Sequence, residues 1–175
     1  MSDENEPLRA PMSEQEIEAG LDRFSEFVNA TAPEQVIEWF DNEASDLLDG
    51  LWAACGERLN EDEWDAMFAL LPRIYALLVP KELDRYEIDE ERLATGFASW
   101  EKAVPVELSA RDLARSRQPR VLEDVLTLLA DIIQHEEVFR GPSKAVAIAL
   151  LAATVDEVDI TVVESQEDEG EDTKS

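Results

Sequence analysis

The chain has 175 residues, 45% of them hydrophobic, and its 42 acidic and 15 basic side chains give a formal net charge of −27 at pH 7. This apolar content excludes a wholly disordered chain, and the charge argues against direct binding to nucleic acid or to an anionic membrane, because both depend on Lys and Arg contacting phosphate. A single Cys and a single His exclude a disulfide framework, a Cys-based zinc site and a multi-histidine metal centre.

The N-terminal residues 1–12 contain Pro7 and Pro11 and no apolar period, which predicts a flexible leader. Its polar, acidic character is unlike a signal peptide, so we expect a cytoplasmic protein. A helical domain is predicted over residues 13–156. Its first helix begins at the capping box Ser13–Glu16 and ends near Asn29. One apolar stripe at spacings of three and four defines this helix: Ile17, Leu21, Phe24 and Val28.

Three further helices are predicted before residue 80. Pro33 suits the first turn of one helix, which breaks near Asp41, and the next helix extends from about Glu43 to Leu59. Asn60 is a cap candidate for the following helix, and Pro72 should kink or stop it. The helix over 43–59 has a broad apolar stripe that includes a tryptophan: Ala44, Leu47, Leu48, Leu51, Trp52 and Cys55.

The second half of the chain is also helical by pattern. A helix follows a cap at Asp89, residues 109–118 form a short arginine-rich helix or turn, and Pro119 opens a helix that extends to about Ile133. After the stop signal at Gly141-Pro142, residues 144–154 are apolar almost all round. Because this segment is too short to span a bilayer, we expect it to be the central buried helix of the bundle.

The C-terminal part differs in pattern from the rest. Val158, Ile160 and Val162 alternate with polar residues, as in a strand, so residues 157–163 are predicted to be an extended segment on the surface; dimerisation by strand pairing is the alternative. Residues 164–175 are acidic and predict a disordered tail. The sequence thus predicts an all-α, single-domain bundle of about seven or eight helices.

A group of arginines is the main compositional anomaly. Arg111, Arg115, Arg117 and Arg120 lie together in a strongly acidic chain, and Arg111 and Arg115 would share one helix face. They either bind a phosphate or an acidic partner segment, or they pair with carboxylates of the chain itself. The abundance of acids favours internal pairing, yet these arginines remain candidate partner-binding residues.

Tryptophans are the other candidates for partner binding. Trp64 and Trp100 lie at helical spacing with other apolar residues and are expected in the core, whereas Trp39 is expected to be partly exposed. Several tryptophans in one exposed groove would indicate a peptide site. Trp39 is therefore added to the candidate partner-binding residues.

Residues with catalytic potential have simpler interpretations. His135 is expected to be a surface residue at a helix end, and Cys55 an inert core residue. The acidic runs at 61–65 and 87–91 lack the ligand alternation of a calcium loop and fit solvated helix N-termini. We therefore expect no catalytic residues, no metal site and no cofactor.

The functional expectation is a non-enzymatic, cytoplasmic adaptor or chaperone-like protein that binds a protein partner of unknown identity. One alternative is an inhibitor or immunity-type protein that covers a basic, nucleic-acid-binding partner; another is an enzyme using carboxylates and Mg²⁺ in the bundle. The acidity also fits adaptation to concentrated salt or plain solubility. The predominance of Arg over Lys, which occurs only at Lys81, Lys102, Lys144 and Lys174, is compatible with salt adaptation.

Overall fold

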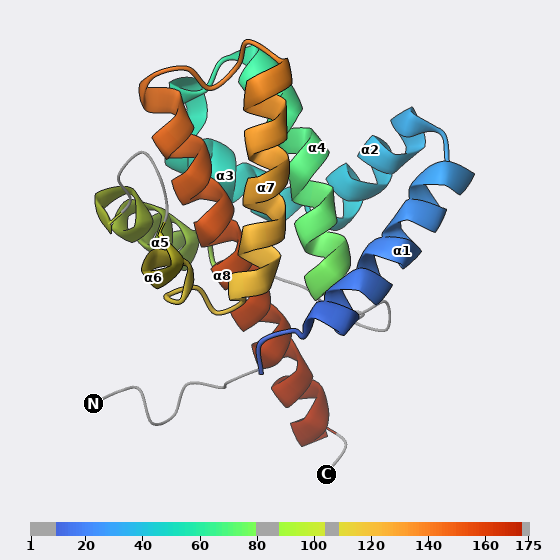
Figure 1. The fold of residues 1–175 in the computed structure, drawn as a ribbon. Coiled ribbons are helices and arrows are strands. Elements are labelled where there is room, and N and C mark those ends of the chain that lie inside the picture. Colours follow the sequence, from blue (N-terminus) through green and yellow to red (C-terminus); the bar gives the residue numbers. More distant parts are fainter. Residues whose placement is uncertain (1–9, 80–87, 104–108, 173–175) are drawn as a thin grey trace.

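The computed structural model describes residues 10–79, 88–103 and 109–172, with the side chains of Ala110 and residues 166–172 excepted. Over these residues the chain forms eight α-helices and one 3₁₀ turn, with no strand, so the predicted all-α class is confirmed (Figure 1). The elements are α1 (Glu14–Ala30), α2 (Pro33–Glu43), α3 (Ser45–Cys55), η2 (Gly56–Arg58), α4 (Glu61–Leu78), α5 (Glu90–Ala103), α6 (Ala110–Leu113), α7 (Pro119–His135) and α8 (Pro142–Asp172).

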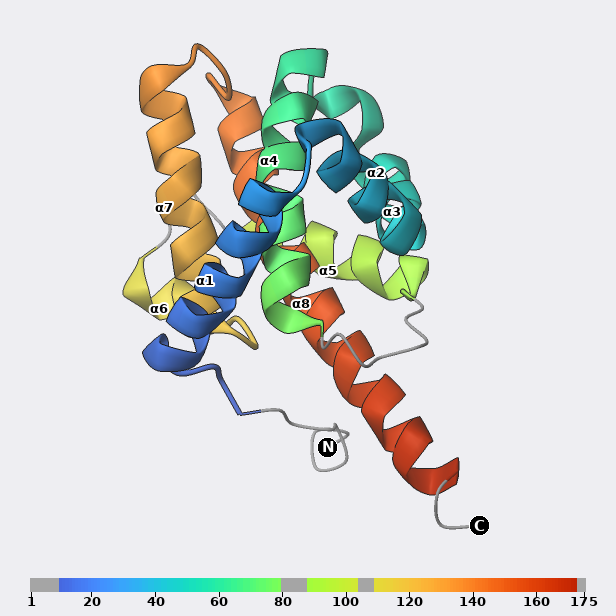
Figure 2. The ribbon, with the colours of Figure 1, turned by 90° about the vertical axis from the view of Figure 1, so that its right-hand side faces the viewer.

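Helix α8 is the central element of the bundle. It packs against α4, α5 and α7, and every residue from Val146 to Val155 is buried. Such all-round burial requires an apolar surface without a polar face, which is what this segment provides. The prediction of a central buried helix over residues 144–154 is confirmed, and Figures 1 and 2 show that the C-terminal end of α8 projects beyond the other helices.

The segment 157–163 is helical rather than extended, which corrects the sequence-based prediction. Val158 and Val162 are one helical turn apart and both are fully buried, so these two positions of the alternating pattern also fit one helix face. Burial against the bundle decides between the two conformations, since local propensity is a weak determinant. With no strand in this segment, dimerisation by strand pairing loses its structural basis there.

The first helix is tied to the bundle by the residue that precedes its cap. Ser13 accepts a hydrogen bond from the Glu16 amide, as the capping signal predicts. Met12 is buried, and its amide donates to Gln118 Oε1 at 2.7 Å. The end of the predicted leader is therefore docked, while residues 1–9 lie outside the described residues.

Helix α4 begins with a complete capping box and continues through Pro72 rather than stopping there. Asn60 accepts from the Glu63 amide, and Glu63 Oε1 accepts from the Asn60 amide. The second oxygen of the buried Glu63 accepts from the Phe139 amide at 2.9 Å, where Phe139 has a φ of 56°. This carboxylate thereby holds the loop between α7 and α8 against the start of α4.

The described C-terminal residues are helical. Residues 164–172 of the predicted acidic tail continue α8, and residues 173–175 lie outside the described residues. Within the part of the chain that the structure describes, no helix combines the length and apolar character needed to cross a membrane.

Candidate partner-binding surface

Arg117 points into the protein and pairs with a buried carboxylate. Its Nε donates to Asp159 Oδ2 at 2.9 Å, and the side chain of Asp159 is only 1% exposed. The Arg117 amide also donates to Asp156 Oδ1 at 2.8 Å. Arg117 therefore braces the connection between α6 and α7 against α8, as the internal-pairing interpretation predicts.

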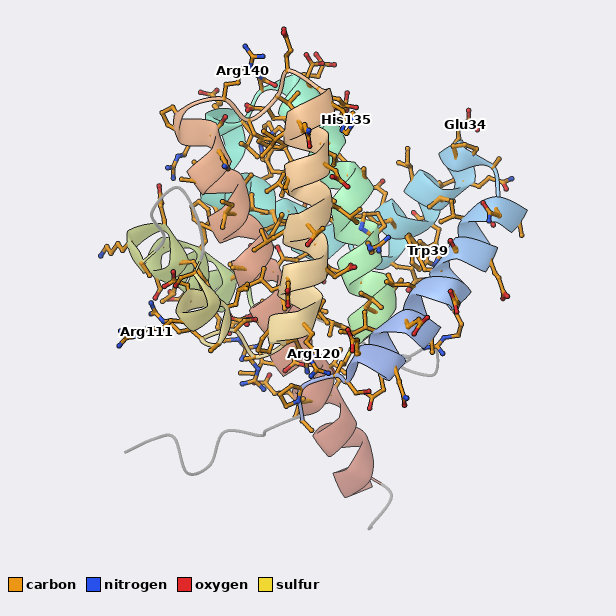
Figure 3. All side chains as sticks on the ribbon, viewed as in Figure 1. Glu34, Trp39, Arg111, Arg120, His135 and Arg140 are labelled. Carbon is orange, nitrogen blue, oxygen red and sulfur yellow. The ribbon has the colours of Figure 1, made fainter. Side chains whose placement is uncertain are left out.

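The other three arginines of the group do not form one site with it. Helix α6 ends at Leu113, so Arg111 and Arg115 do not share a helix face. Arg115 is exposed, with its guanidinium carbon 5.8 Å from the centre of the Trp100 ring. Arg111 lies on α6 and Arg120 on the first turn of α7, both exposed and well apart in Figure 3.

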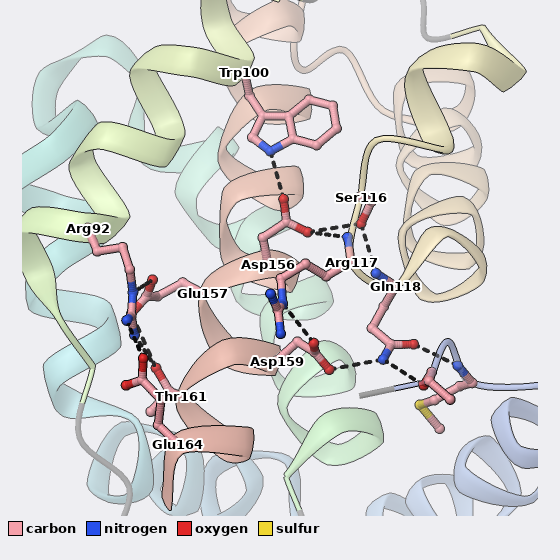
Figure 4. Close-up of polar contacts among 12 residues, drawn as sticks. Arg92, Trp100, Ser116, Arg117, Gln118, Asp156, Glu157, Asp159, Thr161 and Glu164 are labelled. Atoms are coloured by element: carbon pink, nitrogen blue, oxygen red, sulfur yellow. Dashed lines mark hydrogen bonds and ion pairs between the residues drawn. The ribbon is translucent and has the colours of Figure 1, made fainter. Parts of the chain in front are cut away.

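A polar network on α8 surrounds Arg117 (Figure 4). Asp156 accepts hydrogen bonds from Trp100 Nε1 at 3.0 Å and from Ser116 Oγ at 3.1 Å. Gln118 Nε2 donates to Asp159 Oδ1 at 2.9 Å. Burial raises the pKa of Asp156, and the hydrogen bonds from the Arg117 amide, Trp100 and Ser116 act in the opposite direction.

A second ion-pair cluster ties α5 to α8. Arg92 donates to both oxygens of the buried Glu157, at 2.8 and 2.9 Å, and to Glu164 at 2.7 Å. Hydrogen bonding to Glu157 raises the pKa of Arg92. Glu157 also accepts from Thr161 Oγ1 at 3.2 Å. Both oxygens of the Glu157 carboxylate therefore have hydrogen-bond donors within the fold.

The inward carboxylates lie along α8 and are bound by donors from other elements, and Arg117 serves two of them, Asp156 through its amide and Asp159 through its Nε. The Asp156 carboxylate accepts from Trp100, that of Glu157 from Arg92, and that of Asp159 from Arg117. The three carboxylates therefore do not converge on one point. Among the described residues, no group of three or more His, Cys, Asp and Glu is placed to hold a metal ion.

The remaining residues with catalytic potential lie at separate places. His135 is exposed at the end of α7, and its Nδ1 donates to the Asp131 carbonyl oxygen at 2.8 Å. Cys55 is buried, and burial raises the pKa of its thiol to about 11. At neutral pH this thiol is protonated, which disfavours a nucleophilic role.

Trp39 forms part of an aromatic cluster between three helices. Its ring centre lies 5.1 Å from that of Phe27 on α1 and 5.8 Å from that of Tyr75 on α4, both in edge-to-face geometry. Trp39 is half-buried, as expected, and Figure 3 shows it in the angle between α1 and α2. Its main contacts hold these helices against α4.

Trp64, which was expected in the core, is only half-buried. Trp52, which was predicted on the apolar stripe of its helix, departs further from the prediction. It is 58% exposed, more than any other large hydrophobic side chain among the described residues. Leu47, Leu51 and Cys55 define the buried face of α3, and Trp52 lies about 100° from Leu51, at the edge of the stripe. The face of a helix that packs on a core is about 100° wide. The apolar stripe predicted from the sequence is wider than this, so Trp52 falls outside the buried face.

Trp52 packs on a second tryptophan whose position is fixed. The ring centres of Trp52 and Trp64 are 5.6 Å apart, and Trp64 Nε1 donates to the Gly56 carbonyl oxygen at 3.0 Å. Leu48 and Phe68, both half-buried, lie one helical turn from Trp52 and Trp64. We call these four residues, Leu48, Trp52, Trp64 and Phe68, the aromatic surface.

Acidic groups lie beside the aromatic surface. Asp49 on α3 and Glu61 and Asp65 on α4 are exposed. The only two basic side chains in residues 45–78 are already paired: Arg58 with Glu101 and Arg73 with Asp124. Within residues 45–78, the exposed charges beside the two tryptophans are therefore mainly acidic.

A groove of about 500 Å³ opens between α4 and the C-terminal end of α7. Its lining contains four apolar residues and four exposed carboxylates, one of which, Glu137, pairs with Arg140 at 3.2 Å. By chemistry, we call the apolar lining residues the floor and the carboxylates the rim: Ala66, Ala69, Ile132 and Val138, and Asp62, Asp65, Glu136 and Glu137. We call this the acidic groove.

Comparison with known proteins gave no relative from which function could be transferred. No family model, no curated protein and no solved structure matches this chain.

Proposed function

We propose that this protein is a non-enzymatic, adaptor or chaperone-like protein that binds a protein partner through the aromatic surface. The observation that supports this most strongly is the 58% exposure of Trp52 on top of the fixed ring of Trp64. Tryptophan supplies a large contact area with few rotatable bonds and is enriched among residues that dominate binding energy. A rigid second tryptophan beneath it reduces the ordering cost of binding.

The same argument disfavours the arginine group as the binding site. Arg117 has its guanidinium on Asp159, and Arg115 lies against Trp100. Two exposed arginines on separate helices, Arg111 and Arg120, offer no preformed site for a phosphate or an acidic segment.

A pull-down from an extract of the source cells tests the proposal. Trp52→Ser should abolish recovery of a partner that the wild type retains, because it removes the exposed ring without opening the core. Ile37→Ser is the matched control, since Ile37 is 53% exposed on α2 and lies outside the aromatic surface. Arg111→Glu combined with Arg115→Glu should also leave the partner bound. Full recovery with Trp52→Ser would contradict the proposal.

An inhibitor or immunity-type role toward a basic partner is the second candidate. It is favoured by the pairing of Arg58, Arg73, Arg92 and Arg117 with carboxylates on other elements, which leaves exposed acids dominant outside. Such binding should weaken by orders of magnitude as salt rises, because charge steering is screened. Equal affinity at low and moderate salt would argue against this role.

Salt adaptation is a separate proposal about the conditions of function. A net charge of −27 destabilises the compact state by self-repulsion, and salt screens that repulsion. A salt-adapted protein should lose helical circular dichroism in dilute buffer and regain it in concentrated salt. Full stability in dilute buffer would assign the acidity to solubility or to a partner.

A further inference from the structure

The aromatic surface and the acidic groove are adjacent on α4. Around the helix, Phe68 lies about 40° from Trp64 and about 60° from Asp65, so it lies between the tryptophan and the groove rim. Asp65 is both the neighbour of Trp64 in sequence and a lining residue of the groove. A single ligand can therefore contact the tryptophan pair and the groove together.

We propose that the two together form a docking site for a cationic amphipathic helix of a partner protein. The inference rests on the proposed function and specifies the chemistry of the partner. Apolar side chains of the helix would pack on Trp52 and Trp64, and Lys or Arg side chains would enter the groove. There the alkyl stem of a Lys or Arg would cover the apolar floor, and the charged group would meet the rim carboxylates.

Charge complementarity selects this occupant over the others. The rim carboxylates Asp62, Asp65 and Glu136 are exposed, and Asp49 and Glu61 extend the negative surface beside the tryptophans. A second copy of this chain would bring the same negative surface, and opposing like charges disfavour such a pair. Nucleic acid and anionic lipid are repelled for the same reason.

Binding of two designed peptides tests the chemistry of the partner. The probe is a labelled helical peptide with Leu on one face and Lys on the other, and its counterpart has Glu in place of Lys. Fluorescence anisotropy at about 0.05 M NaCl should show binding of the Lys peptide alone, with marked weakening at about 0.5 M NaCl. Equal binding of both peptides, or of neither, would overturn the inference.

Two matched charge variants separate local recognition from long-range attraction. The groove variant is D62N/D65N/E136Q/E137Q, and the control is E14Q/E18Q/D22N/E26Q, which removes the same charge from exposed positions on α1. The groove variant should bind the Lys peptide about tenfold more weakly, whereas the control should stay within about twofold. Equal weakening would mean that net charge alone attracts the peptide and that the groove is not a site.

Trp52→Ser completes the design and separates this inference from the proposed function. It should weaken the Lys peptide at least about tenfold while leaving helical circular dichroism unchanged. A Trp52-dependent dimer of the wild type in sedimentation equilibrium would make a second copy the occupant and overturn the inference. If the pull-down partner needs Trp52 but the groove variant and the peptide charge have no effect, the inference fails and the proposed function stands.

Discussion

Replacing Asp159 by Ala tests whether the polar network on α8 holds the bundle together. Asp159 is fully buried and accepts hydrogen bonds from Arg117 Nε and Gln118 Nε2, both at 2.9 Å. Its loss leaves a guanidinium and an amide inside the protein without that acceptor. Removing one member of a buried ion pair costs about 3–5 kcal/mol.

The exposure of Arg117 places the expected loss at the lower end of that range. Its side chain is 18% exposed, so part of the guanidinium can recover hydration once the carboxylate is gone. We expect Asp159→Ala to lower the free energy of unfolding by about 3 kcal/mol, a large share of the roughly 5–15 kcal/mol of a typical domain. In urea this corresponds to a midpoint lower by about 1.5 M.

Urea unfolding followed by circular dichroism measures this loss, with Asp124→Ala as the control. Arg73 and Asp124 form a two-bond pair, at 2.8 and 3.2 Å, but their side chains are 24% and 22% exposed. We expect Asp124→Ala to cost only about 1 kcal/mol because solvent screens the pair. Replacing Arg117 and Asp159 together by Met and Leu should restore more than half of the loss. The reasoning is refuted if Asp159→Ala costs no more than Asp124→Ala.

Three other predictions concern packing, reactivity and pH. In Gly50→Ala the new Cβ would lie 2.9 Å from the side chain of the buried Leu93, so the free energy of unfolding should fall by about 1–2 kcal/mol. In Gly96→Ala the nearest atom to the new Cβ is 4.0 Å away, so the free energy of unfolding should rise by about 0.5–1 kcal/mol. Cys55 should react with a thiol reagent at pH 8 no faster than unfolding exposes it, because its side chain is buried. Even where the reagent has access, a pKa of about 11 leaves only about one thiolate in a thousand. Rapid labelling of the native protein would contradict this. The pKa of Asp156 is raised in the folded protein, so the stability that this group contributes is present below its unfolded pKa and is lost as pH rises through the folded pKa. In urea titrations, the wild type should therefore gain stability relative to Asp156→Asn as pH falls from 7 toward 4. A constant difference between the two proteins would show that Asp156 keeps an ordinary pKa.

The helices could be predicted because their signals are local. The cap at Ser13, the capping box at Asn60 and Glu63, and Pro119 in the first turn of α7 all lie where the sequence places them. Each of these features satisfies or replaces a free backbone amide within one turn of the helix. Information of this range is contained in a few consecutive residues.

The polar network could not be predicted because its partners are far apart in sequence. Asp159 and Arg117 are separated by 42 positions, and Arg92 and Glu157 by 65. In a chain with 42 acids, each arginine has many possible partners, and only the packing of α5 and the α6–α7 connection against α8 selects one. The general expectation of internal pairing was correct for Arg117, while the identity of its partner depended on the fold.

The aromatic surface was missed for a different reason. The five stripe residues on α3 span a wider arc than the face that α3 buries, so the sequence contained the signal that one of them must be exposed. Trp52 lies farthest from the centre of the face formed by Leu47, Leu51 and Cys55. A prediction based on a narrower apolar stripe would have placed Trp52 on the surface. Its contact with Trp64 depends on the turn at η2, which connects α3 and α4.

The placement of charge links the stability of the bundle to its capacity to bind. Arg58, Arg73, Arg92 and Arg117 each pair with a carboxylate from another element and thereby hold helices together. Beside Trp52 and Trp64, the carboxylates Asp49, Glu61 and Asp65 remain exposed. In the proposed docking, a cationic partner would relieve repulsion among these carboxylates, and the same repulsion would disfavour self-association. Under this proposal, the fold would select a partner whose charge is opposite to its own.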